Sequence, residues 1–482
     1  MWDNLLIRNL FFNKANIYKN YFINFLLFVS CIFLLINPAI LNGYPLVYSD
    51  TGTYIISGFS KFVPIDRPIM YGLFVRKISG AESLWYVILM QSFIVNSLVL
   101  ICFQNLFKSD KSFLKTFITI TFLSLTTGLP NYVSQIMPDI FTAIEILSIG
   151  LFFFAIELSI IKRVYLSFLI IFSNLVHSSN LITSASITIL FFIILLLLKE
   201  RKQLLPKLSI FLSGILIIFS GWLILPSVNY YYKSGFELSK ANNIFFMGRL
   251  IESGIVSAYL DDNCNSKNIP LCKFKDKFPM DAPKFIWSTD SSPLYEGGCI
   301  NKGWEGNWGD CWIEKDKEYS PIIHEILTTP KYLMLLIQSV IKNSINQLIT
   351  FDIGHLIPMM DGSPIKDLIK IHYRHEFNQY ITASQAYETL YFRSLSRVQN
   401  IIVLLSILIC LLFFTIKSIR RKIRLNLRLF TFFIVLGTII NAFTCSTFSG
   451  VVNRYEGRVI WLLPFIIIAI ISSFNRIKEM LR

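Results

Sequence analysis

The chain has 482 residues, of which 54% are hydrophobic and 15% aromatic, and its mean hydropathy is +0.57. Soluble domains average about 45–50% apolar residues, and many apolar runs here approach the roughly 20 residues that cross a bilayer, which excludes a soluble protein. The net charge of +15 indicates no nucleic-acid partner, because basic residues flank the apolar runs while the polar segment 226–399 carries 18 Lys and Arg against 19 Asp and Glu.

The apolar runs predict an all-α polytopic membrane protein. We expect about ten transmembrane helices, at 22–40, 84–106, 116–129, 140–160, 164–176, 181–198, 208–226, 399–416, 429–444 and 459–474. Basic residues precede the first span and follow every second span, and the strongest basic cluster lies at 417–428. The positive-inside rule therefore predicts that both termini are cytoplasmic and that the long polar segment is external.

This topology divides the chain into three predicted regions. They are an N-terminal membrane region at 1–226 with a first external loop at 41–82, an external soluble domain at 227–398, and a C-terminal membrane region at 399–482. We expect the external domain to be rich in α-helix. Within it, 331–350 is apolar but interrupted by polar side chains, which predicts an amphipathic helix at the membrane interface rather than another span.

The eight cysteines fall into two groups. Four lie in or beside apolar runs, where a free thiol behaves as a small apolar side chain. The other four, in the external domain, are Cys264, Cys272, Cys299 and Cys311. They predict disulfides in an oxidising compartment, with sequential pairing of Cys264 to Cys272 and of Cys299 to Cys311 as the expected pattern. A zinc site is the alternative, but no Cys-x-x-Cys or Cys/His spacing supports it.

The first external loop has the densest polar chemistry beside any span. Asp50 follows the first span, within a run of polar and aromatic residues that ends at Tyr54. Asp50 is either the N-cap of a short helix or a catalytic carboxylate, acting as a general base or orienting an acceptor hydroxyl. For the catalytic role, we expect partial burial to raise its pKa into a useful range.

The same loop continues to Tyr71. Asp66 and Arg67 are expected either to form a local ion pair at a turn or to leave Arg67 as a ligand for a donor phosphate, because a planar guanidinium matches phosphate oxygens. Tyr54 and Tyr71 are candidate substrate contacts.

Two later external stretches can meet this loop. Asp139 precedes the fourth span and is either a helix cap or a second catalytic carboxylate. Asp50 and Asp139 together would suit Mg²⁺ or Mn²⁺, so a divalent cation is the one cofactor considered. His177 ends the fifth span and is either a satisfied polar residue in a helix break or a substrate contact.

The last external loop contains two arginines, against the positive-inside trend. We expect Arg454 and Arg458 to bind a lipid phosphate, with Tyr455 and Glu456 as substrate contacts. The alternative is an aromatic-belt tyrosine beside an arginine whose charged end reaches the interface.

This layout resembles the GT-C glycosyltransferase superfamily, polytopic membrane enzymes that take sugars from polyprenyl-phosphate donors on the outer face. The resemblance implies a GT-C-like fold, an essential acid soon after the first span, a second acid in the next external turn and late arginines near the donor phosphate. Asp50 and Asp139 stand at the positions of the two acids, and Arg454 or Arg458 stands at that of the late arginine.

A second resemblance, to an uncharacterised group of bacterial multi-span membrane proteins, rests on residues 246–254 and on the Tyr259, Cys264 and Cys272 that follow. It implies no activity. Within this segment Arg249 and Glu252 lie one helical turn apart, so they form an ion pair, or Arg249 recognises an acceptor. No peptide-acceptor motif of an oligosaccharyltransferase is present, which argues against a protein acceptor.

Residues and resemblance together predict a GT-C-type glycosyltransferase of the bacterial inner membrane. It would move a sugar from a polyprenyl-phosphate-linked donor to an envelope glycan or lipid on the periplasmic face. The alternatives are an envelope polysaccharide polymerase or flippase, and a non-enzymatic envelope scaffold. Polar residues concentrated at the external ends of apolar spans favour surface chemistry over transport.

Overall fold

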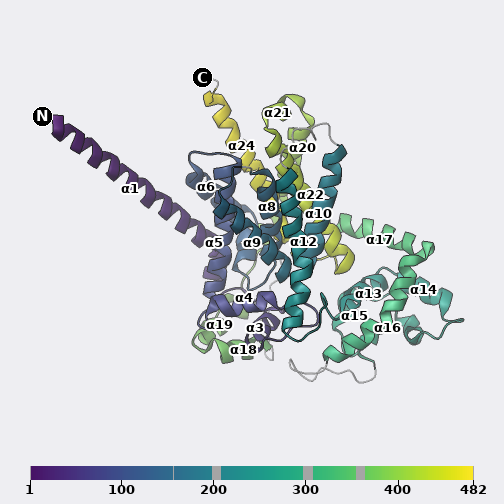
Figure 1. Cartoon of the computed structure of the whole chain (residues 1–482). Helices are drawn as coiled ribbons and strands as arrows, with labels where there is room; N and C mark the ends of the chain where they lie inside the picture. The colour runs from purple at the N-terminus through teal and green to yellow at the C-terminus, as the bar shows by residue number, and fades with distance from the viewer. Residues whose placement is uncertain (1, 156, 198–207, 297–307, 354–363, 481–482) are drawn as a thin grey trace.

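The structure, a computed structural model, describes residues 2–155, 157–197, 208–296, 308–353 and 364–480. In these ranges the chain is predominantly helical, and its β pairing consists of one isolated bridge between Leu46 and Gln135. The predicted all-α class is therefore confirmed. Figure 1 shows a bundle of long helices with a group of shorter helices at one end.

The bundle is built from the helices of the apolar runs. They are α1 (Trp2–Leu35), α5 (Trp85–Ile101) with the π-helical turn η1 (Cys102–Leu106), α6 (Ser112–Thr126), α8 (Ile140–Phe154), α9 (Ile160–Val176), α10 (Ser178–Leu197), α12 (Leu208–Tyr231), α20 (Arg393–Thr415), α22 (Leu425–Phe448), α23 (Asn453–Ile460) and α24 (Leu462–Met480). Short helices at the bundle ends are α2 (Asn37–Asn42), α3 (Thr51–Ser60), α4 (Met70–Ser79), α7 (Leu129–Ser134) and α21 (Lys417–Lys422).

Among the described residues, seven stretches are long and apolar enough to cross a membrane. They are Tyr18–Leu35, Trp85–Leu106, Ser178–Leu197, Ser209–Tyr231, Arg393–Thr415, Leu425–Phe448 and Asn453–Ser472. The chain is therefore a multi-pass membrane protein. Each of the ten predicted spans overlaps a helix, but those in α6, α8 and α9 fall short of this length, so the count of ten stays a prediction.

Three helices of the bundle are short for a membrane span. α6 and α8 have 15 residues each and α9 has 17. At about 1.5 Å per residue they are about 22–26 Å long, less than the roughly 30 Å of a bilayer core. The polar residue just before α8, Asp139, is nevertheless enclosed by protein and only 1% exposed.

The two ends of the bundle differ in what they carry. In Figure 1 both termini lie toward the end that also holds α21, with its basic residues, whereas α3 and α4 lie at the opposite end. Beside α3 and α4 lie the helices of the predicted external segment. These are α13 (Asn242–Glu252), α14 (Ile255–Asn263), η3 (Pro270–Lys277), α15 (Ala282–Trp287), η4 (Pro293–Tyr295), α16 (Trp308–Thr328), α17 (Pro330–Leu348), α18 (Pro364–His372), η5 (Arg374–Glu376), α19 (Phe377–Ile381) and η6 (Ser384–Tyr387).

The external segment contains two packing units. The buried apolar residues between 241 and 332 form their own core, which includes Leu250, Tyr259 and Trp312. The part after 364 instead packs against the first external loop and shares the main core of the bundle. There Glu376 accepts a hydrogen bond from the Tyr44 hydroxyl at 2.9 Å. This hydrogen bond fixes the position of the loop that leads to Asp50.

One predicted disulfide is present. Cys264 and Cys272 are bonded, which ties the end of α14 to η3. Cys299 lies outside the described residues, so the second predicted pair, Cys299 with Cys311, stays a prediction.

The predicted interfacial segment 331–350 is the helix α17. Its exposed apolar residues Met334, Ile341 and Ile345 form one arc, while Gln338, Lys342 and Asn346 form an adjacent exposed polar arc. Figure 1 shows α17 extending sideways from the bundle rather than along it. α17 thus has an apolar arc beside a polar arc and lies steeply across the bundle axis. Both features are expected of a helix that lies in the interface between membrane and water.

A nitroxide label on α17 is expected to report this orientation. In proteoliposomes, a label at Ile341→Cys should collide more with dissolved oxygen, which concentrates in lipid, than with a water-soluble nickel chelate. A label at Lys342→Cys, next to it on the polar arc, should show the reverse. Power-saturation EPR measures both, and equal nickel accessibility at the two positions would exclude an interfacial helix.

Candidate functional site

Asp50 lies directly before α3, at the end of the bundle that holds α3 and α4. Its side chain makes no capping hydrogen bond, so the N-cap alternative is wrong. One carboxylate oxygen instead lies 3.2 Å from Nη1 of Arg67, and the other lies 3.3 Å from Nη1 of Arg454. The Thr51 hydroxyl serves the local turn, accepting a hydrogen bond from the Tyr48 backbone N–H. Asp50 therefore forms ion pairs with two arginines that come from opposite ends of the sequence.

The two guanidinium groups determine the protonation state of Asp50. Burial raises the pKa of this carboxyl, but the charges of Arg67 and Arg454 outweigh burial and lower the pKa to about 2. The expectation of a raised pKa is therefore wrong, because it considered burial without the arginines. Since an aspartate in an unfolded chain has a pKa of about 3.9, this carboxylate stabilises the fold above that pH, and its contribution disappears as the pH falls toward about 2.

Arg67 is positioned by a tight contact between α3 and α4. A Cβ atom on Gly58 would lie 2.2 Å from the carbonyl oxygen of Gly72, so only glycine permits this approach. The connecting turn holds Asp66, which accepts hydrogen bonds from Nε and Nη2 of Arg67. The predicted local ion pair is confirmed, and the same guanidinium also reaches Asp50.

Asp139 is a buried counter-ion for the late arginines. Its side chain makes no capping hydrogen bond to α8, so the capping alternative is wrong here too. Its Oδ1 lies 3.4 Å from Nη1 of Arg458 and 3.6 Å from Nε of Arg454. Asp139 therefore joins the turn between α7 and α8 to α23, but it lies behind the cavity described below rather than in its wall.

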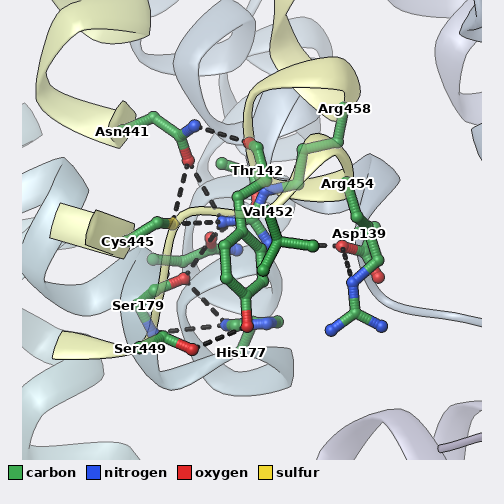
Figure 2. Close-up of polar contacts among 12 residues, drawn as sticks. Asp139, Thr142, His177, Ser179, Asn441, Cys445, Ser449, Val452, Arg454 and Arg458 are labelled. Atoms are coloured by element: carbon green, nitrogen blue, oxygen red, sulfur yellow. Dashed lines mark hydrogen bonds and ion pairs between the residues drawn. The ribbon is translucent and has the colours of Figure 1, made fainter. Parts of the chain in front are cut away.

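Arg458 is completely buried and does not line that cavity. Its Nη2 donates to Oδ1 of Asn441 at 3.1 Å and contacts Oγ of Ser179 and Sγ of Cys445, each at 3.3 Å (Figure 2). These contacts fix α23 against α10 and α22. Arg458 is thus placed to position Arg454, one helical turn earlier, rather than to touch a substrate.

Arg454 faces the cavity. Its guanidinium carbon lies 4.5 Å from the centre of the Tyr48 ring and 5.4 Å from that of Tyr455. The Tyr455 hydroxyl in turn lies 2.6 Å from Oγ of Ser449. Two aromatic rings and two carboxylates therefore hold Arg454 in one orientation, which is how a binding site for an anion is preorganised.

His177 lies in the break between α9 and α10 and lines the cavity. Its Nδ1 lies 2.8 Å from Oγ of Ser179, a residue that also contacts Arg458 (Figure 2). Burial lowers the pKa of His177, and the charges of Arg458 and Arg454 lower it further, to well below its usual value. His177 is therefore neutral at physiological pH and can donate or accept a hydrogen bond without adding charge.

For these reasons His177 should lose its proton well below pH 6.5, where an unperturbed histidine changes charge, and should stay neutral at physiological pH. Carbon-13 NMR of histidine-labelled protein in detergent measures this, with the signal identified by its loss in His177→Gln. The chain has 5 histidines, so assignment by single substitution is practical. A midpoint between about pH 6 and 7 for His177 would contradict the described surroundings.

The other predicted substrate contacts separate into two groups. Tyr54 and Arg249 line the cavity, and Arg249 is ion-paired with Glu252. Tyr71 lies behind Tyr54, with ring centres 4.9 Å apart, and its hydroxyl donates to Gln91 at 2.8 Å. Glu456 is buried and accepts a hydrogen bond from Asn441 at 3.0 Å, away from the cavity wall.

Many of these residues line a cavity of about 1730 Å³. One part of its wall is polar and comes from the bundle, with Asp50, Arg67, His177 and Arg454. Apolar side chains of α10, α12 and α22 form another part, and further parts come from the segment between α3 and α4 and from α13, α15 and α16. Ligand pockets usually measure about 300–1000 Å³, so this volume is sufficient for two substrates together.

The formal charges around the cavity cancel. Asp50, Asp66 and Asp139 face Arg67, Arg454 and Arg458 through the ion pairs described above. In the described part of the chain, no three His, Cys, Asp or Glu side chains gather in a way that could hold a metal ion. A divalent cation at Asp50 and Asp139 stays a prediction, and the positive charge beside these acids comes from arginine.

Several residues of the site were not singled out from the sequence. Tyr48 packs on Arg454, and Ser179, Asn441 and Cys445 hold Arg458. A usable signal existed for Asn441, because a polar residue within a membrane span usually has a specific partner. The same signal marks Glu145, which is completely buried in α8 although the spans were treated as almost purely apolar.

Comparisons of the chain with protein-family models, with curated proteins and with solved structures gave no match. The features that bear on a function are therefore the cavity, its charged wall and the membrane-spanning helices.

Proposed function

We propose that this protein is an inverting membrane glycosyltransferase that uses a polyprenyl-phosphate-linked sugar. The acceptor is an envelope glycan or lipid on the external, periplasmic face of a bacterial inner membrane. The observation that carries the proposal is Asp50, ion-paired to Arg67 and Arg454 in the wall of a large cavity at one end of the bundle. One carboxylate and two guanidinium groups together are what the transfer of a sugar from a lipid phosphate needs.

The two arginines supply what a lipid phosphate needs. A guanidinium binds phosphate oxygens through two parallel N–H groups, and it does so most strongly where water is excluded. Arg67 and Arg454 both contact Asp50 in the structure, so an arriving phosphate competes with Asp50 for them. The apolar wall between α10, α12 and α22 offers a path for the first isoprene units from the membrane.

This competition also changes Asp50. When phosphate oxygens take over the arginines, the carboxylate loses the charges that lower its pKa. It then becomes a stronger base at the moment when the donor is in place. The pairing therefore keeps Asp50 ionised and inactive as a base until the donor binds.

The reaction is a single displacement. The acceptor hydroxyl oxygen attacks the anomeric carbon, its proton moves to Asp50, and the bond from that carbon to the phosphate oxygen breaks. The electron pair leaves with the polyprenyl phosphate, whose added negative charge is stabilised by Arg454 and Arg67. Hydrogen-bond donors that point at the charge developing in the transition state typically stabilise it by about 3–4 kcal/mol each.

Envelope profiling of cells that lack the gene tests this function against the alternatives. We expect one sugar to be missing from an envelope glycan or lipid, with the lipid-linked donor accumulating. Accumulation of complete but unpolymerised or untranslocated glycan units would instead indicate a polymerase or flippase. An unchanged envelope profile would leave only a scaffold role.

A further inference from the structure

We propose that the cavity wall formed by α13, α15 and α16 binds the acceptor as a saccharide. This inference rests on the proposed transferase function and names the class of acceptor. The wall lies across the same cavity as Asp50, so a sugar bound there can present a hydroxyl to it.

The cavity walls differ in chemistry. The bundle side holds the acids and arginines around Asp50, whereas the helices of the 241–332 core bring the rings of Phe245, Trp287 and Trp312 close together. Their ring centres form a cluster, with Trp287 at 5.6 Å from Trp312 and 6.3 Å from Phe245. The charged wall suits a phosphate, and the aromatic wall suits a different ligand.

Trp287 is the exposed member of this cluster. Its side chain is 47% exposed, while Trp312 beside it is 1% exposed. Trp312 packs beside the ring of Trp287 from within the domain, and Trp287 also lines the cavity. A large aromatic surface kept open in a cavity wall is the feature expected where a ligand covers it. The C–H face of a pyranose ring is flat and apolar, and it fits such a surface.

Polar groups lie on the same wall for the hydroxyls of the sugar. Arg249 is ion-paired with Glu252, and both line the cavity. The pair presents N–H donors and carboxylate acceptors together, and a sugar hydroxyl can both donate and accept. The exposed amide of Asn242, at the start of α13, adds a further donor and acceptor.

The wall is rigid. The Asn243 backbone N–H and side-chain amide donate to the two oxygens of Asp316, at 2.7 and 3.0 Å, which ties α13 to α16. Gly248 allows α13 to approach α15 closely, since a Cβ there would lie 3.2 Å from the Phe285 ring. A held aromatic surface between fixed polar groups favours a saccharide over a lipid tail, which would need a continuous apolar groove.

Acceptor material from cells that lack the gene provides the probe. Their envelope is separated into a lipid-free saccharide fraction and a lipid extract, and binding to immobilised full-length protein is measured by interferometry. We expect the saccharide fraction to bind, about tenfold more weakly to Trp287→Ala and almost normally to Trp287→Phe, which keeps an aromatic face. Tyr391→Ala, at an exposed tyrosine outside the cavity, is the matched control and should bind normally.

Two results would overturn the inference: binding of the lipid extract alone, or equal saccharide binding by wild type and Trp287→Ala. Binding of polyprenyl phosphate to the same proteins separates this failure from failure of the proposed function. Retained polyprenyl-phosphate binding by Trp287→Ala shows that the variant is folded, so that its lost saccharide binding supports the site. If wild type binds no polyprenyl phosphate but its saccharide binding still depends on Trp287, the transferase proposal is wrong and the saccharide site is supported.

Discussion

Replacing Asp50 with asparagine is expected to lower sugar transfer by at least about 100-fold, since a general base typically contributes about 10²–10⁴-fold. Asparagine keeps the shape of the side chain but cannot accept the acceptor proton. The measurement is the envelope sugar content of cells that carry Asp50→Asn in place of the wild-type gene, with the protein level quantified in parallel.

Asp66→Asn is the matched control for this substitution. Asp66 is ion-paired with Arg67, as Asp50 is, but it has no described contact with Arg454. We expect a much smaller loss from Asp66→Asn than from Asp50→Asn. Near-normal sugar transfer by Asp50→Asn at normal protein levels would show that Asp50 is not the general base.

Replacing Arg454 with glutamine is expected to lower transfer by about 10²–10³-fold, the usual effect of removing one donor to a developing negative charge. Lysine at the same position should restore only part of the activity, because it lacks the planar fork that binds two phosphate oxygens. Transfer by purified protein in proteoliposomes, with the lipid-linked donor extracted from cells lacking the gene, measures both variants.

Arg76→Gln is the control for charge removal in general. Arg76 lies in α4, stacks on Phe59 at 4.6 Å and does not line the cavity. It should leave transfer nearly unchanged. Equal losses in Arg76→Gln and Arg454→Gln would mean that the arginines act through stability alone.

The sequence was sufficient to place the candidate site in the chain. Asp50, Asp139 and Arg454 all stand at predicted external ends of apolar runs, and an antiparallel bundle must gather such ends. The structure brings these three into one network of ion pairs. The helices themselves could be predicted because long apolar runs in a membrane have few alternatives to helix.

Side-chain partners could not be predicted from sequence, and they account for the errors. Asp50 has a lowered pKa because Arg67 and also Arg454, which is 404 positions later, contact it. Arg454 and Arg458 are one turn apart on α23, yet only Arg454 lines the cavity, because Asn441 and Cys445 of α22 hold Arg458 inside the bundle. The aromatic wall around Trp287 depends on the packing of three helices, which no local pattern specifies.

We propose that Asp50 and the phosphate of a lipid-linked donor compete for the guanidinium groups of Arg67 and Arg454. Equilibrium binding of polyprenyl phosphate to wild type, Arg454→Gln and Asp50→Asn, measured by native mass spectrometry or thermophoresis in detergent, tests it most directly. The claim predicts weaker binding by Arg454→Gln and tighter binding by Asp50→Asn, since removing the competing carboxylate frees both guanidinium groups. Equal binding by all three proteins, or weaker binding by Asp50→Asn than by wild type, would contradict it.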